Sequence, residues 1–187
     1  MWMIFHKPSP VGMLTLSSDG TALTGLWLDG QKYFGAGLPN AVKENDLPVF
    51  EQVSAWLDAY FAKAPLPALP PLAPQGSPFR QAVWRLLLEI PYGTVTTYGA
   101  LARTLRGQGI SAAAQAVGGA VGHNPISILI PCHRVVGSDG SLTGYAGGVA
   151  NKQFLLEPYL ERTDMFSLEL EGVDMTGLYV PTRGTAL

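Results

Sequence analysis

Residues 64–76 constrain the fold most strongly, because proline is concentrated there. Five of these thirteen residues are proline. Proline lacks a backbone N–H and cannot be placed inside a helix or a central strand without loss of hydrogen bonds. A segment of this composition is typical of an extended, stiff connector. The sequence therefore predicts a domain at residues 1–63, a linker at 64–76, a second domain at 77–163, and a tail at 164–187 without an assigned role.

The first domain has the pattern of a small sheet with one helix. Apolar segments with partial alternation at residues 13–16 and 26–28 predict short strands, and the polar residues 18–21 predict a hairpin turn between strands. Residues 48–62 carry apolar side chains at helical spacing, which indicates an amphipathic helix. We therefore expect a three-stranded sheet and one helix in an α/β-like domain.

The second domain begins with a helix start signal. Ser77 is suited to be the N-cap, and Pro78 fits the first helical position. Apolar residues then recur on one helical face up to residue 90, and Pro-Tyr-Gly at 91–93 ends the pattern. We interpret this face as core.

Two further helices are predicted on either side of a glycine turn at residues 107–109. Thr97 can cap the first helix and Ser111 the second, which would run over residues 112–121. This is helix-turn-helix spacing. The second helix is rich in alanine and glycine, which permits close approach of a packed helix or of nucleic acid. The predicted fold class is α+β, with a mainly helical second domain.

Charge and cysteine content exclude several classes of protein. The net charge is −2, but residues 93–152 carry 4 basic and 1 acidic side chains, a weak electrostatic footprint for nucleic acid. One cysteine excludes an internal disulfide framework, and the histidines show no metal-ligand spacing. No apolar run reaches the length of a membrane span, and no signal peptide is evident. We expect a cytoplasmic protein without metal or cofactor.

The only cysteine, Cys132, lies in the stretch 124–136. Residues 128–130 are apolar and predict a buried strand, which Pro131 ends. A free cysteine is commonly a small buried hydrophobe, whereas a single cysteine beside a histidine is also a candidate nucleophile. The residues alone leave these two interpretations open. On a strand, His133 would point to the opposite face, so a water or a turn would have to link the two side chains.

The stretch around Cys132 resembles the active-site signature of the O6-alkylguanine-DNA alkyltransferases. The sequence Pro-Cys-His-Arg-Val-Val follows Gly-His-Asn-Pro-Ile-Ser-Ile and precedes Gly-Ser-Asp-Gly-Ser-Leu-Thr-Gly-Tyr-Ala-Gly-Gly. The similarity covers about residues 77–156 strongly and the first 63 residues weakly. It includes upstream matches at residues 77–79, 83–84, 90–93, 98 and 116–120.

The resemblance implies a single-turnover transfer of an alkyl group from O6-alkylguanine to Cys132 after base flipping. His133 would take the thiol proton through water, and Tyr98 would donate a proton toward the guanine oxygen. Asn124 would brace the junction between the second helix and the active-site strand. The residues implied in DNA or substrate binding are Gln115, Ala116, Gly118, Gly119, Arg134, Val135, Tyr145, Ala146 and Gly147.

Two positions depart from the commonest family pattern. Gln115 stands where many members have an arginine that fills the space left by the flipped base. Tyr159 stands where many members have a glutamate that completes a Cys–His–Glu relay. Glu157 and Glu161 flank that position, and Pro158 could shift one of them into place. The identity of this relay partner therefore stays open.

The expected partner is double-stranded DNA containing O6-alkylguanine. The protein is expected to be a monomer and to have no membrane partner. In a eukaryote the protein would be nuclear. An alternative is a module that binds and flags alkylated bases without transfer, although non-repairing relatives replace the cysteine that is present here. A thiol hydrolase is a remote third reading, since no oxyanion-hole motif is visible. The range of alkyl groups and activity on O4-alkylthymine stay open.

Overall fold

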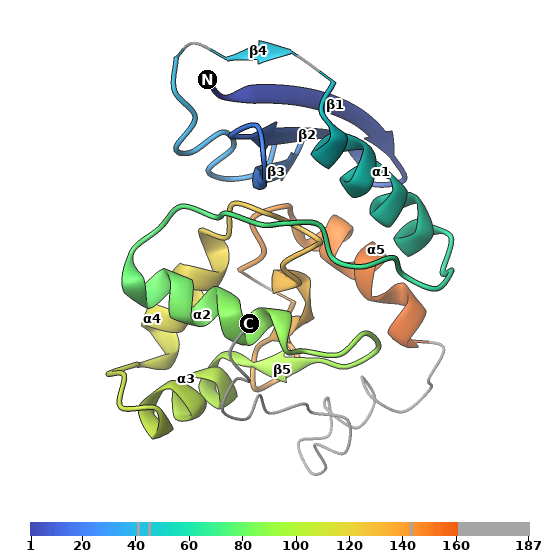
Figure 1. The fold of residues 1–187 in the computed structure, drawn as a ribbon. Coiled ribbons are helices and arrows are strands. Elements are labelled where there is room, and N and C mark those ends of the chain that lie inside the picture. The colour runs from blue at the N-terminus through green and yellow to red at the C-terminus, as the bar shows by residue number, and fades with distance from the viewer. Residues whose placement is uncertain (41, 45, 143, 161–187) are drawn as a thin grey trace. The chain divides into compact units, whose positions relative to one another are not determined.

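A computed structural model describes residues 1–40, 42–44, 46–142 and 144–160, which form two compact units (Figure 1). Unit 1 contains residues 1–75 together with the short segment 125–129, and unit 2 contains residues 76–124 and the chain from residue 130 onward. The sequence did not indicate that residues 125–129 group with unit 1. The predicted domain limits stay predictions, and the tail at 164–187 lies outside the described residues.

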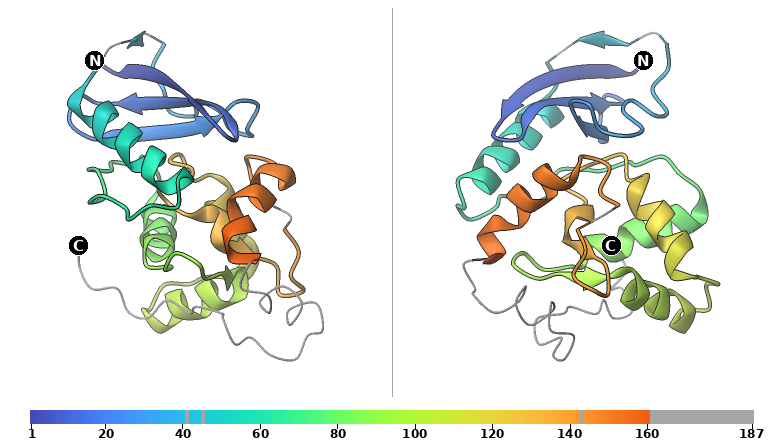
Figure 2. Two further views of the ribbon diagram at one scale, coloured as in Figure 1. Left: turned by 90° about the vertical axis from the view of Figure 1, so that its right-hand side faces the viewer. Right: turned by 180° about the vertical axis from the view of Figure 1, so that it is seen from behind.

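The sheet of unit 1 is built from three antiparallel strands and one short addition (Figure 2). Strands β1 (Met3–Ser9), β2 (Gly12–Ser18) and β3 (Leu23–Leu28) pair in the order β3-β2-β1. The two-residue strand β4 (Lys43–Glu44) pairs with β1 in parallel. The predicted small three-stranded sheet and the α+β fold class are confirmed.

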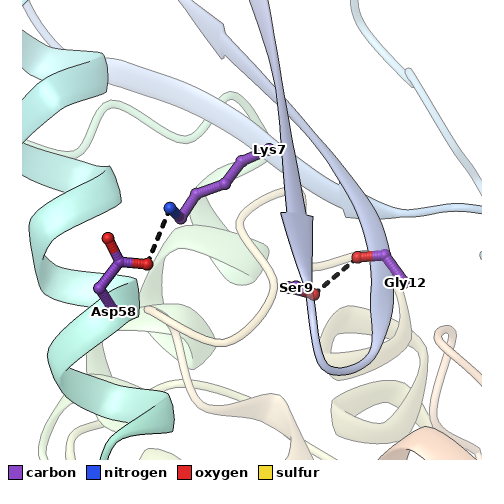
Figure 3. A network of polar contacts seen from close by, with 4 residues as sticks. All are labelled: Lys7, Ser9, Gly12 and Asp58. Carbon is purple, nitrogen blue, oxygen red and sulfur yellow. Dashed lines mark hydrogen bonds and ion pairs between the residues drawn. The ribbon is translucent and has the colours of Figure 1, made fainter.

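Helix α1 (Pro48–Phe61) agrees with the helix predicted at residues 48–62 and packs against this sheet. The Phe50 ring stacks on the ring of Phe5 in β1, with centroids 5.6 Å apart. The ammonium of Lys7 lies 2.8 Å from the Asp58 carboxylate (Figure 3). The Asp58 side chain is 70% exposed, so this ion pair contributes little to stability. The apolar contact is therefore the main attachment of the helix.

The outer edge of β3 is covered by two segments from distant parts of the chain. Residues 71–73 pair with Leu23 through two backbone hydrogen bonds of 2.9 and 2.8 Å. Residues 125–127 pair with Leu26 in the same way, with lengths of 2.8 and 2.9 Å. An open strand edge has unpaired N–H and C=O groups, and these two short bridges occupy part of that edge.

Gln31 adds a side-chain link to the segment 125–129. Its Oε1 accepts a hydrogen bond of 2.9 Å from the Leu28 backbone N–H and one of 3.1 Å from the Ser127 hydroxyl. Both bonds are buried. The segment is thus held in unit 1 by backbone and side-chain bonds together.

Unit 2 is mainly helical, as predicted. Its helices are α2 (Pro78–Leu88), α3 (Tyr98–Gly107), α4 (Ala114–Gly122) and α5 (Val149–Leu160). Strands β5 (Thr96–Thr97) and β6 (Val135–Val136) pair in parallel. Among the described residues, no helix is long and apolar enough to cross a membrane.

Two of the three predicted helix caps in unit 2 are confirmed. The Ser77 hydroxyl accepts a bond from Arg80 N, and the Thr97 hydroxyl accepts one from Ala100 N. Ser111, however, is not a cap.

Helix α4 begins at Ala114 with Ala113 as its N-cap and without a side-chain cap bond. The carbonyl of Ala112 accepts a 2.6 Å bond from the Arg106 guanidinium. The first helical bond of α4 therefore runs from Val117 N to Ala113 O.

Helices α2, α3 and α4 pack against one another in unit 2. Helix α4 packs against both α2 and α3. The Trp84 indole N–H of α2 donates a buried bond of 2.8 Å to the Ala120 carbonyl of α4. The α3–α4 pair lies where the helix-turn-helix was predicted, and α4 is fixed by this bond near its C-terminal end, just before Asn124.

Candidate active site

The chain reaches Cys132 through a compact turn, so the strand predicted at residues 128–130 is wrong. Leu129 N bonds to Ser127 O and Cys132 N bonds to Ile130 O, which folds the chain back twice in six residues. Ile128 has φ +71° although it is β-branched, a conformation that costs about 1–3 kcal/mol. Its side chain is fully buried, which offsets this strain. The pairing of 125–127 with β3 and the immediate reversal leave no length for a strand.

Cys132 is the first residue of a 3-10 turn, η1 (Cys132–Arg134). Arg134 N bonds to Pro131 O, and Val135 N bonds to Cys132 O, so the backbone on both sides of the thiol is fixed. Only 4% of Cys132 is exposed. Cys132 and His133 therefore lie in a local turn. Such a turn was one of the two predicted ways to link their side chains.

Asn124 contacts the sulfur directly. Its Nδ2 donates to Cys132 Sγ over 3.1 Å and to the Ile130 carbonyl over 2.9 Å. The Ile130 carbonyl can only accept, so it requires the amide nitrogen, not the amide oxygen, on that side. This contact orients the second N–H of the amide toward the sulfur. Asn124 therefore also places a hydrogen-bond donor on the sulfur of the predicted nucleophile.

Two opposing effects determine the acidity of Cys132. Burial raises the pKa of the thiol, because a thiolate in the interior loses its hydration. The Asn124 hydrogen bond and the positive charge of Lys152 lower that pKa, but burial has the larger effect. The thiol is consequently protonated in the resting protein and needs a base to be activated.

His133 is fully buried, and burial lowers the pKa of its imidazole well below the usual 6.5. The positive charges of Arg134 and Lys152 act in the same direction. The ring is therefore neutral at physiological pH, which is the state in which it can accept a proton.

Tyr98 is the first residue of α3, and its hydroxyl is a proton donor at neutral pH. Burial raises the pKa of this hydroxyl to about 12, and the neighbouring Cys132 thiolate adds to the rise. Two glycines make room for the side chain. A Cβ added at Gly144 would lie 3.1 Å from the Tyr98 hydroxyl oxygen, and one at Gly118 would lie 3.8 Å from the ring.

The residues predicted to line a base pocket follow η1 in the chain. Val135 is buried in β6, and its carbonyl accepts a bond from Lys152. Tyr145 is buried next to Gly147, where an added Cβ would lie 2.7 Å from the Tyr145 ring. Ala146 is half-buried between them. Glycine at 147 is thus required by the position of the tyrosine.

Arg134 lies inside unit 2, whereas the sequence analysis named it for DNA or substrate binding. Only 6% of it is exposed, and its guanidinium donates a 2.7 Å bond to the Ile90 carbonyl. The same group lies 5.6 Å from the centroid of the Tyr92 ring, at cation–π distance. These contacts indicate that Arg134 attaches η1 to the end of α2, and its binding role stays a prediction.

Helix α4 has an exposed face of small side chains. Gln115, Ala116 and Gly119 are exposed, and Gly118 is half-buried beside Tyr98. A Cβ added at Gly119 would meet no atom within 4 Å, so the glycine there is not required by packing inside the protein. The opposite face of the helix, including Val117 and Ala120, is buried.

The predicted candidates for a relay partner of His133 have side chains outside the described residues. The backbone is helical through Pro158 to Leu160. The side chains of Glu157 and Tyr159 and the whole of Glu161 fall outside the description, so their roles stay predictions.

Lys152 was not among the predicted site residues, yet it is completely buried in the first turn of α5. Its Nζ donates a 2.5 Å bond to the Val135 carbonyl. The position was visible in the sequence: Lys152 precedes Leu155 and Leu156 by three and four residues, which places it on the apolar face of a helix. Within the described ranges, no group of residues could hold a metal ion.

In a comparison with known proteins, both parts of the chain match family models. Residues 6–74 match the family model described as "6-O-methylguanine DNA methyltransferase, ribonuclease-like domain", and residues 78–158 match the corresponding "DNA binding domain". A methylated-DNA–protein-cysteine methyltransferase of Haemophilus influenzae is 44% identical over 162 residues, covering 84% of this chain and 88% of that protein. One of Methanosarcina acetivorans is 41% identical over 150 residues, covering 80% and 92%.

Solved structures show the same fold. The structure described as "Mycobacterium tuberculosis OGT in complex with DNA" has a TM-score of 0.73 at 39% identity and covers 91% of this chain and 98% of that one. The O6-methylguanine methyltransferase of the same organism gives 0.75 at 40% identity, covering 88% and 96%. Together with the family models, these similarities show that the chain belongs to the methylated-DNA–protein-cysteine methyltransferases, which are DNA-binding proteins of DNA repair.

Proposed function

We propose that Cys132 is the acceptor of one alkyl group from O6-alkylguanine in double-stranded DNA and that the protein acts once, as a monomer. The observation that carries this proposal is the Asn124–Cys132 contact. The only cysteine of the chain is buried in a fixed turn, and a side-chain N–H donor lies 3.1 Å from its sulfur. A structural thiol needs no such donor, whereas a thiolate formed during a reaction is stabilised by it.

The transfer is a displacement at the alkyl carbon. The thiolate sulfur forms the new S–C bond, the C–O6 bond breaks, and the guanine oxygen takes the bonding electron pair. Neutral His133 accepts the thiol proton, directly or through water, and Tyr98 donates a hydrogen bond toward the guanine as negative charge develops. The guanine anion takes up a proton supplied through Tyr98, and His133 releases the proton that it took from the thiol, so the overall reaction neither gains nor loses a proton.

The buried position of the sulfur requires base flipping. An alkyl group on O6 is inside a base pair, and only an extruded nucleotide can bring it to a thiol that is 4% exposed. The thioether product is not hydrolysed by water at neutral pH, and the chain contains no second cysteine to displace it. Each molecule can therefore react once.

Helix α4 is the proposed DNA-contacting element. Its exposed face of Gln115, Ala116 and Gly119 has no bulky side chain that would hold a groove at a distance. Small residues of this kind suit close contact with a minor groove. Gln115 would fill the space left by the flipped base, with shorter reach than an arginine and no charge.

The test is to incubate the protein with DNA containing O6-methylguanine and to measure the mass of the intact protein. We expect the gain of one methyl group per molecule at saturating substrate, located on the peptide that contains Cys132. Tight binding without a mass change would favour a lesion-binding module. More than one methyl group released per protein would contradict a single-turnover reaction.

A further inference from the structure

Lys152 is the most unusual ionisable residue in the described part of the chain. It is completely buried, and its ammonium makes its hydrogen bond to a neutral acceptor, the Val135 carbonyl. Its backbone N–H bonds to Gly148 O, which places the residue in the first turn of α5. A buried lysine in a protein of this size is costly unless an anion accompanies it.

The position in α5 increases this cost. The first turn of a helix has a positive electrostatic potential from its unpaired N–H groups, which disfavours a cation. Among the described residues, no carboxylate accepts a bond from Lys152 Nζ. Burial lowers the pKa of Lys152 to about 8. Stability alone therefore does not explain a lysine at this site.

The geometry of η1 relates Lys152 to the nucleophile. The turn begins at Cys132, and the Val135 carbonyl that accepts the lysine bond belongs to the residue that ends it. The carbonyl that holds the ammonium therefore follows directly after the turn that contains Cys132. Helix α5 packs directly against η1. The two groups interact electrostatically through the interior, where charge effects are stronger than in water.

We propose that Lys152 is a positioning residue whose ammonium is the buried counter-charge of the Cys132 thiolate. The proposal rests on the function proposed above for Cys132. Lys152 would stabilise the thiolate while neutral His133 takes the proton, so that charge stabilisation and proton transfer belong to different residues.

The other groups at this site do not supply the counter-charge. Among the described residues, Tyr98 interacts electrostatically with Cys132, and the charges of Arg134 and Lys152 both act on His133. His133 is neutral at physiological pH, and Tyr98 carries no charge below pH of about 12. Arg134 is bonded to the Ile90 carbonyl and lies over the Tyr92 ring. Lys152 is the remaining cation that lowers the pKa of Cys132.

The first test is a titration of Cys132 without DNA, in the protein and in Lys152→Met. Because Cys132 is the only thiol, the ultraviolet absorbance of the thiolate and the rate of alkylation by iodoacetamide both report on it alone. We expect the thiol pKa to rise by at least about one unit in Lys152→Met, which means roughly tenfold less thiolate at neutral pH. The exposed neighbour Gln153→Met is the matched control and should leave the titration unchanged.

An unchanged thiol pKa in folded Lys152→Met would overturn the proposal. A second measurement does not require that variant to fold. Electrostatic coupling is reciprocal, so Cys132→Ser should lower the pKa of Lys152, followed by NMR on protein with labelled lysine. Equal lysine pKa values in both proteins would also overturn it. Neither titration uses DNA, so failure of methyl transfer would contradict the proposed function without affecting this result.

Discussion

The two units bury polar side chains in different ways. In unit 1 these groups are neutral and bonded to one another or to the backbone: the Ser17 and Thr24 hydroxyls are 2.9 Å apart, and Gln31 accepts two bonds. In unit 2 the buried polar groups include a thiol, an imidazole and an ammonium, whose pKa values all depart from their ordinary values. Paired neutral groups stabilise one packing arrangement, whereas buried ionisable groups cost stability and mark a site of reaction.

Cys132→Ser should have the largest effect in unit 2. A serine hydroxyl is far too basic to ionise beside a neutral imidazole, so transfer should be lost completely. Binding to alkylated DNA should be retained, because the face of α4 that is proposed to contact DNA is unchanged. Intact mass measures the first property and fluorescence anisotropy with labelled DNA the second. Any methyl transfer by this variant would show that Cys132 is not the acceptor.

Asn124→Ala should slow transfer without abolishing it. A hydrogen bond to a charged group is worth about 1.5–3 kcal/mol, so the single-turnover rate should fall roughly 10- to 100-fold. The thiol pKa should rise, because the donor to the sulfur is removed. Rapid-quench kinetics measures the rate. A normal transfer rate with a normal thiol pKa would show that the buried amide of Asn124 in unit 2, like that of Gln31 in unit 1, does not act on the thiol.

The transfer rate of the unmodified protein should rise with pH. The pKa of Cys132 is raised by burial, so below that pKa the thiolate fraction increases about tenfold per pH unit. His133 stays neutral because its pKa is lowered, and it adds no opposing effect above about pH 6.5. Single-turnover rates at a series of pH values between about 6 and 8 measure this rise. A flat profile would mean that the thiolate is already formed at the lower pH.

Gln31→Ala is the matched amide deletion in unit 1. It removes the acceptor for a buried backbone N–H and a buried hydroxyl, so the free energy of unfolding should fall by about 1–3 kcal/mol. The thiol pKa should not change. Urea unfolding measures stability, with the exposed Gln52→Ala of α1 as control. A changed thiol pKa of Cys132 in folded Gln31→Ala would contradict the expectation that the buried amide of unit 1 affects stability alone.

Gln115→Arg should have the smallest effect. The added charge can make an assisted contact to DNA at the site of the flipped base, so affinity for alkylated DNA should increase by about 1 kcal/mol. Anisotropy titrations at two salt concentrations measure the gain, which should shrink as salt rises. Weaker binding would indicate that the exposed face of α4 does not meet DNA at residue 115.

Local signals in the sequence were sufficient for most of the helices. The amphipathic pattern of α1 and the caps at Ser77 and Thr97 depend on residues a few positions apart, so each could be recognised without tertiary context. Ser111 has the right side chain for a cap, but α4 begins only at Ala114, and the Ala112 carbonyl before it accepts a bond from Arg106. That bond depends on how α3 and the following loop fold together.

The site was predictable only where the family resemblance names residues. The expected strand at 128–130 failed because an apolar run does not distinguish a strand from a buried turn, and the pairing that decides it involves Leu26, about a hundred residues earlier. Lys152 was missed because a charged side chain is ordinarily assumed to face solvent. Its helical spacing from Leu155 and Leu156 contradicted that assumption. A charged residue at a position on the apolar face of a helix is a candidate site residue.

The segment 125–129 has a consequence for the synthesis of the protein. Residues 1–75 leave the ribosome first, yet the piece that pairs with Leu26 is made some fifty residues later. At a synthesis rate of about 5–20 residues per second, unit 1 waits roughly 3–10 s for its last segment. The edge of β3 therefore cannot be covered in chain order, and its pairing with residues 125–127 can form only after the residues just before Cys132 have been made.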